Sequence, residues 1–459
     1  MPNQSTNNEV NVIILAAGQG TRMNSSVSKV LHEVGNKTLI QHVIDAATPL
    51  ASSINVIIGH NSESVKKSVS NNLITWVLQK DQLGTGHAVM QAIPNIQENS
   101  MCLILYGDVP LIQTQTLLKL LEKANKTGFS LLTVIQNDPE GYGRIIRDSS
   151  KSIHSIIEHK DANTEELEID EINTGIMAIT GALLTKYLNQ LEPNNSQDEL
   201  YLTDIVEKAA KDNVTIASFI CENSTEVMGI NDKNNLAEAE RAYQLKIADE
   251  LMTDSLTIKD PSRFDCRGNL TFGNDCIIDV NVVFEGEVRL GKNVLISPNC
   301  IIKNSKIGDN AHIMPNSLIE GSVIGSHTSI GPFARIRPET QIGSHAKIGN
   351  FVEVKKSTIG DNSKVSHLSY IGDSQIGKGV NIGAGVITCN YDGVNKSQTT
   401  IGDGAFIGSN SQLIAPVSIG KNATIGAGST ITQDAPDEKL TLRRNKQSTI
   451  SKWKRPQKK

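Results

Sequence analysis

The chain has 459 residues, enough for about three domains of ordinary size. A formal net charge of −5 and a pI near 6.1 exclude the strongly basic balance of a protein that binds nucleic acid along its length. No run reaches the ~18 apolar residues of a membrane span, and the polar start MPNQSTNNEV has no apolar signal core. The six cysteines form neither a CxxC pair nor a disulfide framework. We therefore expect a reduced, cytoplasmic protein without structural zinc.

Segments of strand and helix character alternate through the first half of the chain. The predicted buried strands are residues 10–16, 55–59, 74–79, 102–108 and 130–135. The predicted helices are residues 39–47, 62–70, 87–93 and 114–126. Such alternation predicts a Rossmann-like α/β domain with a mostly parallel sheet covered on both faces. Ligands on such sheets bind at the carboxyl ends of the strands, where a glycine-rich loop and Tyr106-Gly107-Asp108 are expected.

The glycine-rich loop follows the first strand and runs from Ala17 to Met23. It is not a dinucleotide fingerprint, because Met23 stands where GxGxxG needs glycine, and no GxxxxGK follows. The N–H groups of such a turn can still cradle phosphate, and Arg22 and Lys29 supply cations nearby. Taken alone, the loop leaves phosphate binding and a plain strand-to-helix turn equally open.

A longer series of motifs resembles the signature of the sugar-nucleotide pyrophosphorylases. The first is residues 15–23 followed by Lys29-Val-Leu, although the family usually has proline where Ser28 stands. Gln79 and residues 82–88 are similar to the uracil-reading segment of the UDP-specific members. Further matches follow in chain order at Tyr106-Gly-Asp-Val-Pro110, Gly141-Tyr-Gly-Arg144, Glu158-His-Lys160, Glu171-Ile-Asn-Thr-Gly175 and Gly229-Ile-Asn231.

The resemblance implies a site that joins UTP to N-acetylglucosamine 1-phosphate and releases pyrophosphate. The attacking phosphate is already ionised at neutral pH, so the site must supply alignment and charge neutralisation rather than a general base. The resemblance assigns Asp108 and Asn231 to Mg²⁺ and Arg22 and Lys29 to phosphates. The residues alone also allow Asp108 to form a turn and Asn231 to cap a helix. The other pocket residues that the resemblance implies are Leu15, Ala16, Ala17, Gly18, Gln79, Gly84, Thr85, Tyr106, Gly107, Gly143, Glu158 and Asn173.

An Ala/Glu/Leu-rich segment at residues 233–255 predicts a helix that links two domains. Asp232 is its expected N-cap, and Asp260-Pro-Ser-Arg is a boundary turn. We expect a nucleotidyltransferase domain at residues 1–232 and a second domain at residues 256–459 that ends in a basic tail.

Isoleucine or valine recurs every six residues from about Phe272 to Ile431, and glycine usually follows. Six residues turn an α-helix through about 600°, so positions i and i+6 share no helix face, whereas on a strand they do. The spacing predicts short strands joined by tight corners, with one branched residue per strand pointing inward. This is the pattern of a hexapeptide-repeat parallel β-helix, and an ordinary β-sandwich would not hold it for so long.

The six-residue step breaks at residues 387–400, and polar residues collect just before the break. Insertions in solenoids form loops on one face, often the binding face. In a coil of three hexapeptides, Arg337 and Lys355 would stack on adjacent coils and clamp a sugar phosphate. His367 and Tyr370 lie close by in sequence, although spacing alone leaves His367 one of several histidines in the repeats.

With the solenoid attached, residues 10–455 are similar to the family of bacterial bifunctional N-acetylglucosamine-1-phosphate uridylyltransferases and glucosamine-1-phosphate N-acetyltransferases. Residues 366–370 resemble the segment that holds the family's catalytic histidine. His367 is therefore the expected general base that frees the amine for attack on acetyl-CoA. The residues implied for glucosamine 1-phosphate are Arg337, Lys355, Tyr370 and Asn381. Those implied for acetyl-CoA are Ala384, Asn390, Tyr391, Ser409, Ala427 and Arg444.

The resemblance thus implies a two-site enzyme that makes UDP-N-acetylglucosamine for cell-wall precursors, with acetyl transfer before uridylyl transfer. It also implies a left-handed β-helix and a homotrimer that shares the acetyl site between subunits, neither of which follows from the spacing. Expected partners are UTP, both sugar phosphates and acetyl-CoA, without nucleic acid or membrane. Two alternatives remain: a single-function pyrophosphorylase whose β-helix regulates or oligomerises, and a non-enzymatic scaffold.

Overall fold

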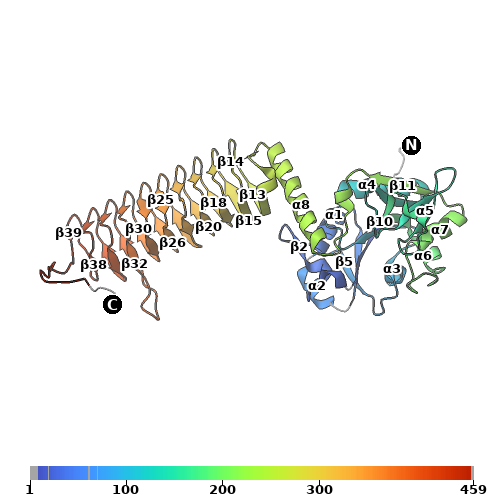
Figure 1. The fold of residues 1–459 in the computed structure, drawn as a ribbon, viewed down its shortest axis with the longest axis horizontal. Coiled ribbons are helices and arrows are strands. Elements are labelled where there is room, and N and C mark those ends of the chain that lie inside the picture. The colour runs from blue at the N-terminus through green and yellow to red at the C-terminus, as the bar shows by residue number, and fades with distance from the viewer. Residues whose placement is uncertain (1–8, 19, 60–61, 70, 456–459) are drawn as a thin grey trace. The chain divides into compact units, whose positions relative to one another are not determined.

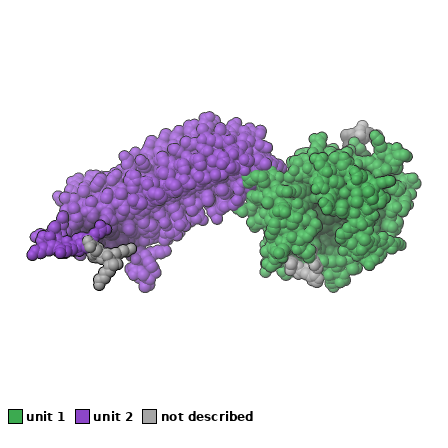
Figure 2. Space-filling view, in the orientation of Figure 1, with its two compact units in different colours: residues 1–243 green, residues 244–459 purple. Residues whose placement is uncertain are grey.

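The computed structural model describes residues 9–18, 20–59, 62–69 and 71–455. They form two compact units, residues 1–243 and 244–459, with the boundary inside helix α8 (Lys233–Thr253) (Figure 2). Gln19 of the predicted glycine-rich loop lies outside the described residues. Within the described part of the chain, no helix combines the length and the apolar character needed to cross a bilayer.

The first unit is built on a mixed sheet (Figure 1), and along its main path only one central strand is antiparallel to its neighbours. Its strands, in spatial order, are β11 (Ile216–Cys221), β7 (Phe129–Ile135), β10 (Glu171–Thr180), β6 (Met101–Tyr106), β1 (Val10–Ala16), β4 (Ser53–Ile58) and β5 (Ile74–Leu78). β10 runs antiparallel to both of its neighbours, and β8 (Arg144–Arg147) and β9 (Ile153–Ile157) extend it. A hairpin of β2 (Glu33–Val34) and β3 (Lys37–Thr38) stands apart. The predicted Rossmann-like α/β domain is confirmed.

Helices cover both faces of this sheet because the strands are apolar on both sides. Val12 and Ile14 of β1 join one core cluster, and Ile13 between them joins the other. The first cluster lies under α1 (Leu39–Ala47), α2 (Ser62–Ser68) and α4 (Thr114–Thr127). The second lies under α3 (Thr85–Met90), α6 (Gly181–Leu188) and α7 (Asp204–Lys211). A single turn, α5 (Thr164–Leu167), follows β9.

The parallel strands bring three loops together at one edge of the sheet. Leu15 pairs with Tyr106 and Ala16 with Ile58, so β1, β6 and β4 end at the same level. The Gly107 N–H donates to the Leu15 carbonyl at 2.9 Å, and the Gln79 N–H donates to the Ile58 carbonyl at 2.9 Å. The glycine-rich loop, the segment after β6 and the segment after β5 therefore lie side by side, as the strand-end rule predicts.

The second unit is a left-handed parallel β-helix with three ladders of strands (Figure 1). The first ladder contains β12 (Thr257–Ile258), β14 (Ile277–Ile278), β16 (Leu295–Ile296), β19 (His312–Ile313), β22 (Ser329–Ile330), β25 (Lys347–Asn350), β28 (Lys364–His367), β31 (Asn381–Ile382), β34 (Phe406–Ile407), β37 (Thr424–Ile425) and β39 (Leu440–Thr441). The second contains β13 (Phe264–Thr271), β15 (Val282–Leu290), β17 (Ile301–Lys303), β20 (Leu318–Glu320), β23 (Arg335–Ile336), β26 (Glu353–Lys355), β29 (Tyr370–Gly372), β32 (Ile387–Cys389), β35 (Gln412–Ile414) and β38 (Thr430–Ile431). The third starts on the end of β15 and continues with β18 (Lys306–Ile307), β21 (Ser322–Ile324), β24 (Thr340–Ile342), β27 (Thr358–Ile359), β30 (Ser374–Ile376), β33 (Thr399–Ile401) and β36 (Val417–Ile419).

The residues that repeat every six positions fill the interior of this helix. Ile330, Ile336 and Ile342, one from each ladder, are all buried. Glycine follows because successive coils approach closely: a Cβ on Gly325 would lie 2.5 Å from the carbonyl carbon of Gly343 in the next coil. The six-residue spacing thus predicted the interior and the corners correctly.

The interruption of the repeat forms an insert at residues 390–398, between β32 and β33. Figure 1 shows it projecting from the solenoid beside β32. At the other end of the second unit, α8 leads into the first coil. Its predicted N-cap is confirmed, because the N–H groups of Asn234 and Asn235 both donate to Asp232 Oδ1 at 2.9 Å.

Candidate active sites

A cavity of about 470 Å³ opens at the carboxyl edge of the first unit's sheet. The predicted residues that line it are Leu15, Ala16, Ala17, Gly18, Lys29, Gln79, Gly84, Thr85, Tyr106, Asp108 and Asn231. They lie at the ends of β1 and β6, in the segments that follow β1, β5 and β6, at the start of α3 and just before α8. The structure therefore brings together residues more than 200 positions apart in the chain.

The other predicted residues of this site lie next to the cavity wall. Gly107 bonds to Leu15, as described above, and the Asn173 N–H donates to the Gly143 carbonyl at 2.8 Å. The Glu158 carboxyl packs against Gly143, where an added Cβ would lie 3.4 Å from its Oε2. Burial raises the pKa of Glu158, although the Thr203 hydroxyl donates to its Oε1 at 3.1 Å.

Two cations and two side-chain oxygens meet at one end of the cavity. The Lys29 ammonium donates to Asp108 Oδ2 and lies 3.4 Å from Asn231 Oδ1. The Arg22 guanidinium also donates to Asn231 Oδ1, at 2.9 Å. A backbone bond of 2.9 Å from the Ile230 N–H to the Asp108 carbonyl ties the two loops together. Because Asp232 caps α8, the side chain of Asn231 is left to face these cations.

The same pair of oxygens has the chemistry of a site for a hard divalent cation. One carboxylate and one amide carbonyl converge on a single ammonium, so both can reach one ion. Among the residues described, no group of three His, Cys, Asp or Glu side chains is placed to hold a metal. A cation bound by Asp108 and Asn231 would thus complete its coordination with substrate phosphates and water.

Ser28, where the resembling family has proline, adopts a proline-like backbone. Its φ is −54° and its ψ is 138°, and no described residue accepts a hydrogen bond from its N–H. Both values suit proline, whose ring fixes φ near −65° and removes the N–H. The loop before Lys29 therefore keeps the usual geometry without the usual residue.

Several cavity residues were not predicted as site residues. Gln82, Tyr142 and Gly229 lie inside motifs that the sequence did single out, so their motifs were the available signal. The Gln82 amide donates to the Ala17 carbonyl at 2.7 Å and so supports the glycine-rich loop. Glu199 also lines the cavity, but it stands in no motif and gave no signal.

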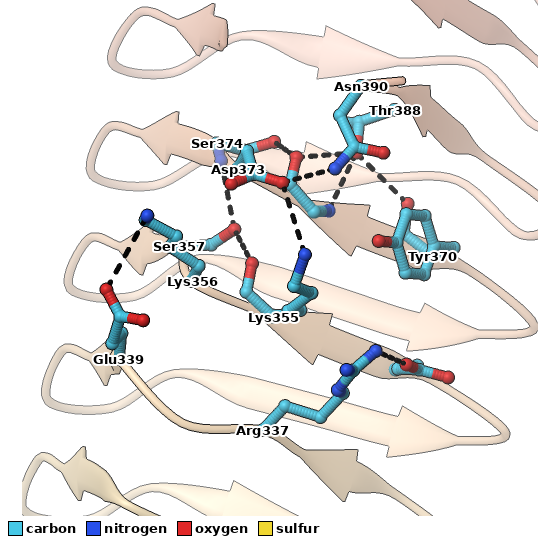
Figure 3. A network of polar contacts seen from close by, with 12 residues as sticks. Arg337, Glu339, Lys355, Lys356, Ser357, Tyr370, Asp373, Ser374, Thr388 and Asn390 are labelled. Atoms are coloured by element: carbon cyan, nitrogen blue, oxygen red, sulfur yellow. Dashed lines mark hydrogen bonds and ion pairs between the residues drawn. The ribbon is translucent and has the colours of Figure 1, made fainter. Parts of the chain in front are cut away.

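In the second unit, Arg337 and Lys355 stack on adjacent coils, as predicted (Figure 3). Each is paired with a carboxylate that the sequence did not reveal. Arg337 Nη1 lies 2.9 Å from Glu353 Oε1, and Lys355 Nζ lies 3.7 Å from Asp373 Oδ2. The Asn390 amide donates to the same Asp373 oxygen. We call these five residues the clamp cluster.

The insert adds another cation to the clamp cluster. Tyr391 and Lys396 pair across the insert by an isolated bridge, which turns the chain back toward the second ladder. The Lys355 ammonium lies beside Lys396 and lowers the pKa of its amine. The predicted Tyr391 itself is mostly exposed. The insert therefore lies beside the clamp cluster, and Lys396 was not identified from the sequence.

His367 ends β28 at the corner between the first and second ladders. Its Nδ1 lies 2.7 Å from Asn350 Oδ1 on the preceding coil. Since the amide oxygen can only accept, Nδ1 carries the proton and Nε2 keeps a free lone pair. Asn350 lies 17 positions away and was not identified from the sequence.

Predicted acetyl-CoA residues continue this corner on the next three coils. The Gly385 N–H donates to the His367 carbonyl at 3.3 Å. On the following coils, the Asn410 N–H donates to the Ala384 carbonyl at 2.7 Å, and the Gly428 N–H donates to the Ser409 carbonyl at 2.8 Å. Residues 350, 367, 384, 409 and 427 therefore form one row along the prism, which we call the corner row. Arg444 lies at the end of the corner row, with its guanidinium packed against Gly426. A Cβ added to that glycine would lie only 2.9 Å from Arg444 Nη2.

The predicted residues of the second site do not all share one face. Tyr370 stands in the second ladder with the clamp cluster, whereas Asn381 stands in β31 of the first ladder. Asn390, predicted on acetyl-CoA, instead contacts Asp373 of the clamp cluster. One chain thus brings Arg337, Lys355 and Tyr370 together and leaves Asn381 on a different sheet.

Comparisons with known proteins cover nearly the whole chain. Residues 12–165 match the family model of the MobA-like NTP transferase domain, residues 266–340 that of the GMPPB C-terminal domain, and residues 398–433 that of the bacterial transferase hexapeptide (six repeats). The chain is 57% identical over 450 residues to the bifunctional protein GlmU of Ruthia magnifica subsp. Calyptogena magnifica. The aligned residues cover 98% of this chain and 99% of that GlmU. It is 52% identical to the GlmU of Idiomarina loihiensis and 50% identical to that of Marinobacter nauticus, at the same coverage of both chains.

Proposed function

Because this chain belongs to the family of bifunctional GlmU proteins, we propose that its two reactions take place at the two sites described above. The chain is a uridylyltransferase and an acetyltransferase of UDP-N-acetylglucosamine synthesis, which supplies cell-wall precursors. Residues 1–232 would carry uridylyl transfer and residues 256–459 acetyl transfer, with residues 233–255 as a helical link. Nucleotide and acetyl-CoA substrates suit a cytoplasmic enzyme.

At the first site, the cavity would hold UTP and N-acetylglucosamine 1-phosphate. The sugar phosphate attacks the α-phosphorus of UTP, the P–O bond to the β-phosphate breaks, and pyrophosphate leaves. Lys29 and Arg22 lie where they can neutralise the phosphates, and the backbone of the glycine-rich loop can approach them closely. Mg²⁺ held by Asp108 and Asn231 would supply further neutralisation of phosphate charge when bound.

At the second site, His367 would act as the general base. Asn350 holds its Nδ1–H, so Nε2 is free to take a proton from the amine of glucosamine 1-phosphate. The amine nitrogen then attacks the acetyl carbonyl, the C–S bond breaks, and the thiol of CoA leaves. The sugar phosphate would bind to the cations Arg337, Lys355 and Lys396. It would take the place of Glu353 beside Arg337 and of Asp373 beside Lys355, and it would neutralise the neighbouring Lys355 and Lys396.

Acetyl-CoA would lie along the corner row. Ala384, Ser409 and Ala427 follow His367 on successive coils, spaced ~4.8 Å apart. Their small side chains leave room for a narrow extended arm, and Arg444 at the far end offers a cation to the phosphates of CoA. The acetyl end would then reach His367.

The β-helix would assemble as a homotrimer through its exposed apolar corner. Phe333 and Phe351 stack with ring centroids 5.3 Å apart and are 50% and 56% exposed, and Leu368 on the next coil is 62% exposed. Each directly follows a corner position of the row that holds Asn350 and His367. A contiguous exposed apolar row of this kind is typical of an interaction surface. Within one chain, Asn381 lies on a different ladder from Arg337, Lys355 and Tyr370. A neighbouring copy packed on the exposed apolar row would bring its own Asn381 toward these residues and so complete the acetyl-transfer site.

The observation that carries the proposal is the alignment of His367 with the small residues of the corner row and the clamp cluster on the adjacent ladder. A two-stage assay with purified full-length protein tests it. Glucosamine 1-phosphate and acetyl-CoA should release free thiol without divalent metal, and pyrophosphate should appear only after UTP and Mg²⁺ are added. Thiol release that requires Mg²⁺, or the absence of either product, would contradict the proposed division.

A further inference from the structure

Three polar side chains form a connected chain behind one wall of the first cavity. Gln79 Nε2 donates to the Gly84 carbonyl at 3.2 Å and lies 3.2 Å from His87 Nδ1. The other ring nitrogen, His87 Nε2, lies 3.1 Å from Gln91 Nε2. The Gln91 amide also donates to the His87 carbonyl at 3.2 Å. Gln79 lines the cavity, His87 lies within α3, and Gln91 is the C-cap residue just after that helix.

This arrangement cannot satisfy both glutamines at once. A neutral imidazole has one N–H and one acceptor nitrogen, yet an amide nitrogen faces each ring nitrogen. One amide must therefore turn its oxygen toward the ring. The choice decides which ring nitrogen carries the proton and which end of the Gln79 amide faces the cavity.

Burial decides which glutamine turns. Gln79 is only 4% exposed, and turning it would place its oxygen against the Gly84 carbonyl, so two acceptors would face each other with little access to water. Turning Gln91 gives up its bond to the His87 carbonyl, but Gln91 is the C-cap residue of α3 and partly exposed, so water can replace that bond. Gln91 therefore presents its oxygen to a protonated Nε2, and Nδ1 accepts from Gln79.

The result is a fixed acceptor at the cavity wall. With its nitrogen held by Gly84 and His87, Gln79 leaves its Oε1 without a donor among the residues that the structure describes. Uracil carries a donor at N3–H, which an amide oxygen can accept. Cytosine carries a lone pair at N3, which the same oxygen repels. A fixed oxygen therefore favours uracil and penalises cytosine.

We propose that His87 and Gln91 are positioning residues that hold the Gln79 amide with its oxygen toward the cavity and so set the preference for uracil over cytosine. This inference rests on the proposed location of the base beside Gln79. Neither residue needs to contact the nucleotide, because each acts through Gln79.

The test compares kcat/KM for UTP and CTP by pyrophosphate release, with full-length protein, N-acetylglucosamine 1-phosphate and Mg²⁺. In His87→Leu the Gln79 amide is free to present either end, and the UTP:CTP ratio should fall about fivefold to tenfold, as loss of one hydrogen-bond constraint implies. In His87→Asn an acceptor remains near the place of Nδ1, and the ratio should recover to within about twofold of wild type. A packing defect would lower both rates and leave the ratio unchanged, which would overturn the inference.

Two further variants separate the tautomer from the location of the base. Gln91→Met removes the acceptor that keeps the proton on Nε2, so the ratio should fall about twofold to fivefold, less than in His87→Leu because water can partly replace that acceptor. An unchanged ratio in Gln91→Met would overturn the positioning role of Gln91 and the assigned proton position. Gln79→Leu should lower the ratio at least as far as His87→Leu. An unchanged ratio in Gln79→Leu would show that the base does not lie there, whereas an unchanged ratio in His87→Leu alone would overturn only the positioning role. The exposed His154, replaced by leucine, is the matched control.

Discussion

Replacing Asn350 by alanine tests how the proposed general base is oriented. Asn350 Oδ1 accepts the Nδ1–H of His367 at 2.7 Å across two adjacent coils, and no sequence motif marks it. Without this bond the imidazole can rotate, and its proton can also occupy Nε2, where it blocks the base. Asn350→Ala should therefore slow acetyl transfer while substrate binding by the clamp cluster and the corner row persists.

The size of the effect follows from one neutral hydrogen bond. Such a bond contributes about 0.5–1.5 kcal/mol net, which corresponds to a fall in kcat of about 2- to 12-fold. Complete loss of a general base would have a larger effect, of about 10²- to 10⁴-fold, so the variant should retain most of the catalysis that His367 supplies.

The assay follows thiol release from acetyl-CoA and pyrophosphate release from UTP in the same preparation. Asn350→Ala should lower kcat for thiol release, with KM for both substrates and the uridylyl rate close to wild type. Asn269→Ala is the control, because it removes an exposed amide that bonds to Glu287 at 3.2 Å in the first coils. An unchanged kcat in Asn350→Ala, or an equal loss of both activities, would refute the assigned orientation.

Three other substitutions test separate parts of the account. Ser28→Pro suits the observed φ and loses no hydrogen bond among the described residues, so it should raise the unfolding free energy by about 0.4–1 kcal/mol, measured by thermal unfolding; a lower Tm would contradict the proline-like geometry. Burial raises the pKa of Glu158 from its ordinary 4.5, so the folded state holds this proton more tightly and stability falls as pH rises through the raised pKa. Glu158→Gln should remove that fall in urea unfolding between pH 4 and 7, and an unaltered pH dependence would be the contrary result. Lys396→Ala should raise KM for glucosamine 1-phosphate and leave KM for acetyl-CoA unchanged, whereas an unchanged sugar-phosphate KM would place Lys396 outside the clamp.

The architecture was predictable because its signals are local. Each six-residue step places one branched residue inward and one corner after it, so the β-helix interior could be predicted from spacing, as Ile330 and Ile336 illustrate. Alternating apolar and amphipathic segments likewise fixed the α/β sheet and the edge that carries Asp108. The resemblance to a family of bifunctional transferases agrees with relatives that match 98% of the chain.

The contacts that tune the sites were not predictable, because they join residues that no motif links. Asn350 reaches His367 only because 17 residues complete one coil, and Asp373 and Glu353 neutralise the clamp cations in the same way. Lys396 depends on how the insert turns back. The bond between Lys29 and Asp108 joins two loops whose meeting requires the whole sheet.

The location of uridylyl transfer and acetyl transfer in separate sites is tested most directly by crossing two variants with two assays. His367→Ala and Asp108→Ala are each measured for thiol release and for pyrophosphate release, after the oligomeric state of both proteins has been compared with that of the wild type. His367→Ala should lose thiol release and keep pyrophosphate release near the wild-type rate, and Asp108→Ala should do the reverse. A parallel loss of both products in either correctly assembled variant would contradict the location of the two reactions in separate sites.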